Sequence, residues 1–130
     1  MVFLSLKQQI FREVHMTINL GDRSQLDIES AFSFNVNYNE DSTLCTAVLR
    51  QEVKEKSDQT VFNIVVEGIG NFLCEGIDDD NGKREAHLQA YTQLFPYVQN
   101  MICRLIVSAG LPPLMIERAK MSADDVKIGT

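Results

Sequence analysis

The sequence predicts an α+β fold in which a four-stranded antiparallel sheet is covered by one long C-terminal helix. Between residues 9 and 74, apolar and polar side chains alternate in four segments separated by short turn sequences, which is typical of strands with one buried face. From about residue 83 to residue 109, apolar side chains instead recur three and four positions apart, as on one face of a helix. The strands are long and their connections short, so we expect sequence neighbours to pair as an antiparallel meander.

Four strands are predicted, and the alternation of apolar and polar residues is clearest in the first two. They span residues 9–20, 25–39, 43–55 and 61–74. In the first strand, Ile10, Val14 and Met16 share one parity, so we expect their side chains on one face. In the second strand, the apolar parity includes Phe32 and Phe34, for which a place in the core is preferred over contact with an apolar partner.

The fourth strand and the turn after it contain unusual residues. Gly68 and Gly70 lie inside the strand, where glycine indicates a bulge or a strong bend. The acidic turn at 78–82 ends the sheet and places carboxylates where a helix N-terminus favours negative charge. A calcium loop aligned on its glycine would place Ile77 and Leu88 at ligand positions, and neither can bind calcium. The turn interpretation is therefore preferred.

The predicted helix has a wide apolar face and defined ends. That face contains Tyr91, Leu94, Phe95, Val98, Met101, Ile102, Leu105, Ile106 and Ala109. Pro96 lies within it, and because proline removes a backbone donor, we expect a kink or a break just before it. Gly110 suits a left-handed C-terminal cap, and Pro112 and Pro113 prevent continuation.

Length and composition indicate one globular domain. The chain has 130 residues, of which 45% are hydrophobic and 23% charged. We expect a single domain over 1–116 and a short C-terminal tail over 117–130, which has little to bury. The net charge of −6 disfavours nucleic-acid binding. No run approaches the roughly 20 apolar residues that span a bilayer, and the apolar start is short for a secretory signal, so we expect no membrane insertion and a cytoplasmic location.

The residues that carry chemistry form no catalytic constellation. Cys45, Cys74 and Cys103 are widely spaced and indicate neither a metal site nor a disulfide framework. Glu85 and His87 are two positions apart on the predicted helix, so they point to different faces. We therefore expect no enzyme, no catalytic residue, no metal and no cofactor.

The chain carries more apolar residues than one helix covers. The surplus includes Phe11, Leu49, Val53, Phe72, Leu73, Leu111 and Leu114. Such a surplus indicates either oligomerisation or a groove for apolar partners, and the alternative is a core fuller than this count.

Several short motifs resemble the SecB family of bacterial export chaperones. They are Asn-Phe-Leu-Cys-Glu at 71–75, Ala-His at 86–87, Ala-Tyr at 90–91, Leu-Phe-Pro-Tyr at 94–97 and Ser-Ala-Gly-Leu-Pro-Pro-Leu at 108–114. Together with four upstream strands, they extend the resemblance over about residues 9–116. It implies a sheet with a long helix, assembled as a homodimer or as a homotetramer made of two dimers.

The resemblance also implies a function and functional residues. SecB-like proteins hold unfolded or precursor polypeptides in apolar grooves without ATP and pass them to the translocase ATPase SecA. In this chain the candidates for docking on SecA are Glu13, Leu73 and Glu75. A further acidic position of the family falls near Thr17, which is not acidic. The candidates for the client groove are Phe11, Phe72 and Leu114. The candidates for the oligomer interface on the helix are Tyr91, Val98, Met101, Ile102 and Leu105.

The C-terminus departs from the family pattern. SecB has a second helix after the proline-containing exit, whereas only residues 117–130 remain here. The chain thus resembles the shorter SecB-like relatives, some of which serve toxin–antitoxin systems. The alternative function is therefore a dedicated adaptor or assembly protein that binds one partner, such as an antitoxin, with no general role in export.

Overall fold

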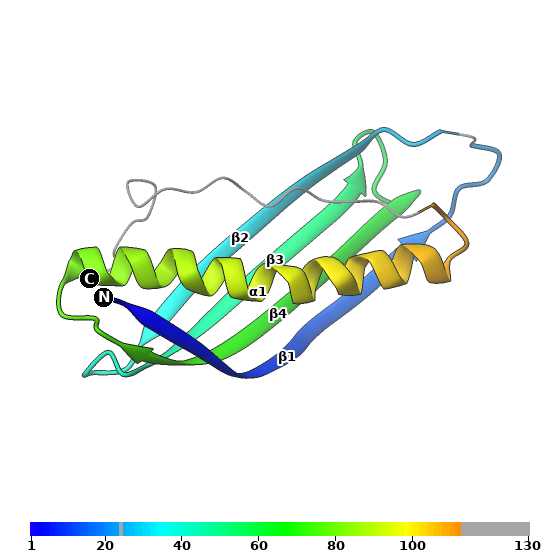
Figure 1. The fold of residues 1–130 in the computed structure, drawn as a ribbon. Coiled ribbons are helices and arrows are strands. Elements are labelled where there is room, and N and C mark those ends of the chain that lie inside the picture. The colour runs from blue at the N-terminus through cyan, green and yellow to red at the C-terminus, as the bar shows by residue number, and fades with distance from the viewer. Residues whose placement is uncertain (24, 113–130) are drawn as a thin grey trace.

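The described part of the protein forms one open four-stranded antiparallel sheet with a single long helix lying across one face (Figure 1). The computed structural model describes residues 1–23 and 25–112. Its elements are β1 (Phe3–Ile18), β2 (Ile28–Tyr38), β3 (Leu44–Glu55), β4 (Phe62–Glu75) and α1 (Asp80–Ser108). The predicted α+β class, with four antiparallel strands followed by one helix, is confirmed.

The strand order β1-β4-β3-β2 differs from the predicted meander. Strands β2, β3 and β4 pair in sequence order, but β1 pairs with β4 instead of β2. The connection at 19–27 therefore crosses from one edge of the sheet to the other. Three strand spacings amount to about 14 Å, and nine extended residues span about 30 Å. A connection that looks like a hairpin turn in the sequence is long enough for this crossing, and β2 becomes an edge strand.

Strand β1 is longer and less regular than predicted. It begins at Phe3, and its register with β4 shifts between Leu6 and Gln8 and again between Phe11 and Glu13. Each shift leaves one residue, Lys7 or Arg12, without a Cα partner. An extra residue reverses the faces of the positions that follow it.

The second shift corrects the predicted face of Ile10. This residue pairs with Ile69 and lies on the face away from the helix, while Val14 and Met16 pair with Val66 and Ile64 on the helix side. The prediction that Ile10 shares a face with Val14 was wrong because a bulge cannot be read from parity alone.

The core lies between α1 and the facing side of the sheet. Strand β3 alternates between buried and half-buried residues along its length, as its parity predicts. The fully buried side chains include Leu49, Val53, Phe62, Ile64, Val66, Phe72, Leu94, Val98 and Ile102. A Cβ atom at Gly68 would lie 2.8 Å from Cγ2 of Val98. Gly68 therefore permits close approach of the helix to β4.

Helix α1 begins and ends in recognisable caps. The Asp79 carboxylate accepts a hydrogen bond of 2.8 Å from the Gly82 N–H and is the N-cap. At the other end Gly110 has φ +82°, and the N–H groups of Gly110 and Leu111 donate to the carbonyls of Val107 and Ile106. This is a Schellman motif.

Pro96 lies inside α1 without ending it. The helix is continuous from Asp80 to Ser108, so the predicted break is not found, and a kink at Pro96 stays a prediction. Within residues 1–23 and 25–112, α1 is not apolar enough to cross a membrane.

Candidate polypeptide-binding surface

Four ring-bearing side chains meet where β2 lies beside α1. Phe34 contacts His87 and Tyr91, with ring centroids 4.9 and 5.3 Å apart, and Phe32 lies 5.7 Å from Tyr91. His87 and Tyr91 are one helical turn apart and therefore share this face of α1. We name Phe32, Phe34, His87 and Tyr91 the aromatic seam.

The aromatic seam is buried on the helix side and open on the strand side. Tyr91 is buried, Phe34 and His87 are half-buried, and Phe32 is 42% exposed. Burial lowers the pKa of His87, which favours the neutral ring in this apolar setting. The assignment of Phe32 to the core was wrong because β2 is an edge strand, whereas a meander would place it inside the sheet.

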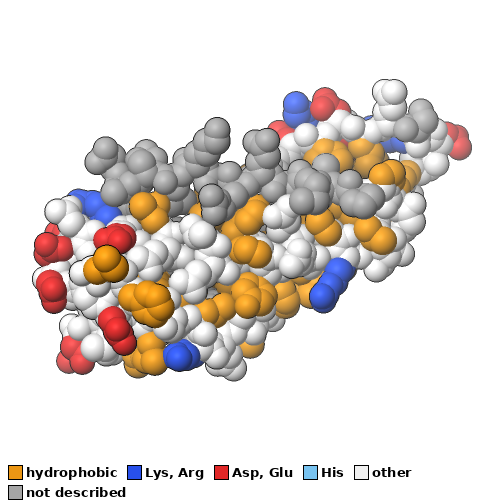
Figure 2. Space-filling view, in the orientation of Figure 1, with side chains coloured by type: hydrophobic (Ala, Val, Ile, Leu, Met, Phe, Trp, Pro, Cys, Tyr) orange, Lys and Arg blue, Asp and Glu red, His pale blue; other side chains and the backbone are white. Residues whose placement is uncertain are grey.

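One end of the seam is held by Tyr38. Its hydroxyl donates a hydrogen bond of 3.0 Å to the carbonyl of Lys83, and the Lys83 ammonium lies 5.6 Å from the centre of the Tyr38 ring. These contacts fix the start of α1 against the end of β2. Figure 2 shows apolar side chains along the helix side of the molecule and acidic side chains gathered at the end where α1 begins.

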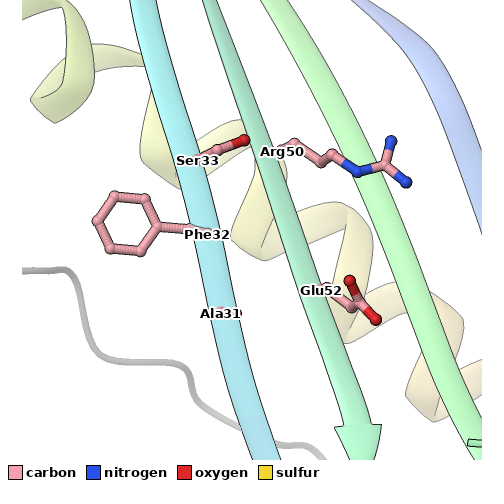
Figure 3. A pocket seen from close by; sticks show the side chains of 5 residues that line it. All are labelled: Ala31, Phe32, Ser33, Arg50 and Glu52. Atoms are coloured by element: carbon pink, nitrogen blue, oxygen red, sulfur yellow. The ribbon is translucent and has the colours of Figure 1, made fainter.

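A shallow hollow of about 250 Å³ lies beside β2 (Figure 3). Its lining is Ala31, Phe32 and Ser33 of β2 with Arg50 and Glu52 of β3. Figure 3 shows the Phe32 ring pointing away from β3, past the edge of the sheet. Ala31, Ser33, Arg50 and Glu52 belong to the face of the sheet away from α1, so the hollow opens on the outer side of the edge strand that carries Phe32.

The predicted groove residues occupy three different settings. Phe72 is 1% exposed and belongs to the core, so its assignment to the client groove was wrong. Phe11 is half-buried and packs against the core from β1, at the edge opposite the aromatic seam. Leu114 lies outside the described residues.

The predicted interface residues of the helix are partly buried in the core and partly accessible. Tyr91, Val98 and Ile102 are buried in the core of the single chain. Their assignment to an interface between copies is corrected, because the chain's own sheet already covers them. Met101 and Leu105 are half-buried and retain surface for a second chain.

The predicted docking residues share a face but not a patch. Glu13, Leu73 and Glu75 all lie on the side of the sheet away from α1. Glu13 pairs in register with Glu67, which is eight residues from Glu75 along β4, a separation of roughly 26 Å. Glu13 also forms an ion pair with Arg50. Leu73 is 43% exposed and pairs with Leu44, which is also exposed.

The described residues offer no evident metal site. No group of three or more His, Cys, Asp or Glu side chains in 1–23 and 25–112 is arranged to hold a metal ion. Cys103 is half-buried, whereas Cys45 and Cys74 are free and buried, and burial raises the pKa of these two thiols. Such thiols are poor nucleophiles.

The aromatic seam was missed in the sequence because of the strand order. Phe32 and Phe34 were recognised as one apolar face, and Tyr91 as part of the helical stripe. Their exposure depends on β2 being an edge strand, which the short connection at 19–27 concealed.

Comparisons with known proteins agree on one family. The family model described as preprotein translocase subunit SecB matches residues 7–123. A protein-export protein SecB of Anaplasma phagocytophilum is 36% identical over 45% of this chain, and the match spans 46% of that relative's length. A SecB-like chaperone of Mycobacterium tuberculosis, in complex with a ChAD peptide from the HigA1 antitoxin, shares the fold with a TM-score of 0.66. It is 17% identical, over 90% of this chain and 88% of that one. This chain belongs to the SecB family.

Proposed function

We propose that this protein is an ATP-independent chaperone that binds extended, apolar segments of unfolded or precursor polypeptides through the aromatic seam. The observation that carries the proposal is the open aromatic edge, where Phe32 is 42% exposed while its neighbour Tyr91 is buried. An exposed ring packed on a fixed aromatic base offers apolar area at little entropic cost. Membership of the SecB family supports the proposal.

Assembly and location form part of the same proposal. Val14 and Met16 of β1 and Tyr97 of α1 are exposed and apolar, and covering such surface would favour a homodimer or homotetramer. We further propose a cytoplasmic location and docking on the translocase ATPase SecA through exposed Leu73 and Glu75. Glu13, which is ion-paired with Arg50, is the weakest of the three docking candidates.

The test is suppression of aggregation of a reduced, unfolded client protein by wild type and by Phe32→Ser. The matched control is Leu73→Ser, which removes an equally exposed apolar side chain from the opposite face. We expect wild type and Leu73→Ser to suppress aggregation and Phe32→Ser to be weaker by severalfold. Absence of suppression by excess wild type would reject the chaperone function, and equal loss in both variants would reject the seam as its site.

A dedicated adaptor is the second candidate. The SecB-like neighbour from M. tuberculosis was determined with an antitoxin peptide bound, which favours recognition of one particular partner. The proteins that copurify with the chain from its native cells distinguish the two functions. One stoichiometric partner supports the adaptor, and a mixture of precursors supports the general chaperone.

A further inference from the structure

The first residues of the chain have the composition of a self-associating strand. Residues 1–6 read Met-Val-Phe-Leu-Ser-Leu and contain no charged side chain, no Pro and no Gly. Short segments of high β-propensity and low charge pair with copies of themselves when they lie at the free edge of a sheet. Residues 3–6 belong to β1, which is an edge strand in the described part of the chain. This part of the edge therefore needs protection.

The segment is held tightly on the helix side of the sheet. Val2 and Leu4 are buried and belong to the core, whereas Phe3 faces the other way and is 59% exposed. Gly76 leaves no room for a side chain, because a Cβ atom there would collide with the Met1 carbonyl. Burial of side chains does not by itself satisfy the outward backbone groups of an edge strand.

Two glutamines of α1 bind backbone groups of this segment. The Gln89 side chain accepts a hydrogen bond of 3.1 Å from the Leu4 N–H and donates one of 2.8 Å to the Val2 carbonyl. The Gln93 side chain donates one of 3.0 Å to the Leu4 carbonyl. Gln89 and Gln93 are one helical turn apart and therefore share one face of α1.

These three bonds lie on the side of β1 where another strand would pair. Leu4 is opposite Cys74 in the register, and the Cys74 N–H bonds to the Thr43 carbonyl next to β3. In an antiparallel ladder, the two residues of a pair either exchange both hydrogen bonds or make none with each other. Leu4 therefore directs its N–H and carbonyl away from β4, to the free side of the edge.

The glutamines reproduce the bonding pattern of a parallel strand. In a parallel pair, one residue accepts from the N–H and donates to the carbonyl of two residues that are two positions apart on its neighbour. Gln89 does the same with Leu4 and Val2, and Gln93 continues the pattern at the Leu4 carbonyl. Four helical residues advance about 6 Å and two strand residues about 6.6 Å. Glutamines four positions apart thus match the repeat of the edge.

We propose that Gln89 and Gln93 form an edge guard, which occupies the place of a further strand beside residues 2–4 and keeps this apolar edge from pairing with the same segment of a second copy. The edge guard ends before Lys7, where the register with β4 shifts. Lys7 is exposed, and a lysine at an edge disfavours strand addition. This inference goes beyond the proposed function and does not depend on it.

The test removes the amide groups while keeping the length of the side chains. Gln89→Met, Gln93→Met abolishes the three bonds, and methionine resembles glutamine in helix propensity. The matched control is Thr92→Met, Asn100→Met, which adds two methionines at exposed positions of α1. Hydrogen–deuterium exchange resolved to single residues and analytical ultracentrifugation compare the variant, the control and wild type over a range of concentrations.

We expect the Leu4 N–H of the double glutamine variant to exchange about fivefold faster than in wild type at low concentration, since it loses a hydrogen bond. As the concentration rises, this variant should form species larger than those of wild type, because its apolar edge is open to a second copy. The Leu4 N–H should regain protection in these species. The control should match wild type in both measurements.

Every other outcome contradicts the edge guard. Faster exchange at Leu4 without larger species would show that the bonds only stabilise the folded chain. Larger species in which Leu4 stays unprotected, or equal association of the control, would place the association elsewhere. Unchanged exchange at Leu4 would show that Gln89 does not bind this N–H. If the double variant does not fold, Gln89→Met with Thr92→Met as its control repeats the comparison, because Gln89 binds both Leu4 and Val2.

A lysine in the segment gives an independent check. Phe3→Lys, added to the double glutamine variant, places a charge in the strand that would self-pair, so it should abolish the larger species. Leu44→Lys is the control, since Leu44 is 49% exposed and lies outside β1. Leu44→Lys should leave the association unchanged. Equal suppression by both lysines would overturn the proposal, because the association would then not be specific to residues 2–6.

Discussion

Arg50 of β3 forms an ion pair with Glu13 of β1 across the intervening strand β4. Glu67 of β4 lies between them in the register and pairs with Arg12 at 2.8 Å. The hydrogen bond from Arg12 lowers the pKa of Glu67, which keeps this carboxylate charged. Two arginines and two glutamates therefore neutralise one another in the middle of the outer face. An acidic docking surface centred on Glu13 would first have to break this network.

We predict that Glu13→Gln lowers the free energy of unfolding by less than about 1 kcal/mol. Both side chains of the Glu13–Arg50 pair are more than a third exposed, so solvent screens their attraction. Urea unfolding in low and high salt measures the effect, and the difference from wild type should shrink in high salt. A loss above about 2 kcal/mol that persists in high salt would contradict the surface interpretation.

The neighbours Phe72 and Leu73 should respond in opposite ways to substitution by alanine. Phe72 faces α1 and is buried, so Phe72→Ala should lower the free energy of unfolding by roughly 3–5 kcal/mol. Leu73 faces outward, and Leu73→Ala should change it by less than about 1 kcal/mol. Chemical denaturation measures both. Similar losses at the two positions would show that Leu73 is not the exposed side chain that the register places on the outer face.

The sequence predicted the elements of this fold better than their arrangement. Parity identified the buried face of β3, and the spacing of three and four identified α1, because both signals are local. The start of α1 was placed three residues late, at Lys83, because Asp79 could not be recognised as the cap. Strand order was wrong because the connection at 19–27 is compatible with either a hairpin or a crossing.

The candidate site was predictable only in part for the same reason. The apolar parity of Phe32 and Phe34 is visible in the sequence, but whether such a face is core or surface depends on which strand lies at the edge. The separation of Glu13 from Glu75 is likewise a property of the pairing between β1 and β4. The edge position of β2 and the distance between Glu13 and Glu75 both depend on pairing between strands distant in the sequence. The spacing of residues within a motif therefore predicts neither.

Glu55 should make part of the protein's stability dependent on pH. Its carboxylate is buried and accepts hydrogen bonds from the Asp27 N–H at 2.7 Å and from the Ser57 hydroxyl at 2.9 Å. Burial acts to raise the pKa of Glu55, but the bonds from Ser57 and Asp27 and the charge of Arg23 outweigh it and lower the pKa. Its stabilising contribution is therefore present above the unfolded-state pKa of about 4.3 and is lost as pH falls through the folded-state pKa.

Glu55→Gln should accordingly flatten the acid limb of the stability curve. Urea midpoints of wild type and variant between about pH 3 and pH 6 measure the change. Glu52→Gln, on the outward face of β3, is the matched control and should leave the limb unchanged. An acid limb that is as steep in Glu55→Gln as in wild type would exclude this carboxylate as its source.

The contact between Gly68 and Val98 sets the distance between α1 and the sheet. A Cβ atom at position 68 would lie 2.8 Å from Cγ2 of Val98, which is closer than two carbon atoms can pack. Gly68→Ala should therefore displace the helix and lower the free energy of unfolding by roughly 1–3 kcal/mol. Val98→Ala alone should lower it by roughly 2 kcal/mol through the cavity that it leaves.

The double variant Gly68→Ala, Val98→Ala tests whether one contact causes both losses. The new methyl group would occupy space that Val98 vacates, so the double variant should be more stable than the sum of the single losses predicts, with a coupling of at least about 1 kcal/mol. Denaturant titration of the four proteins completes the cycle. Strictly additive losses would mean that the added methyl group at position 68 is strained by its own strand, and not by contact with Val98.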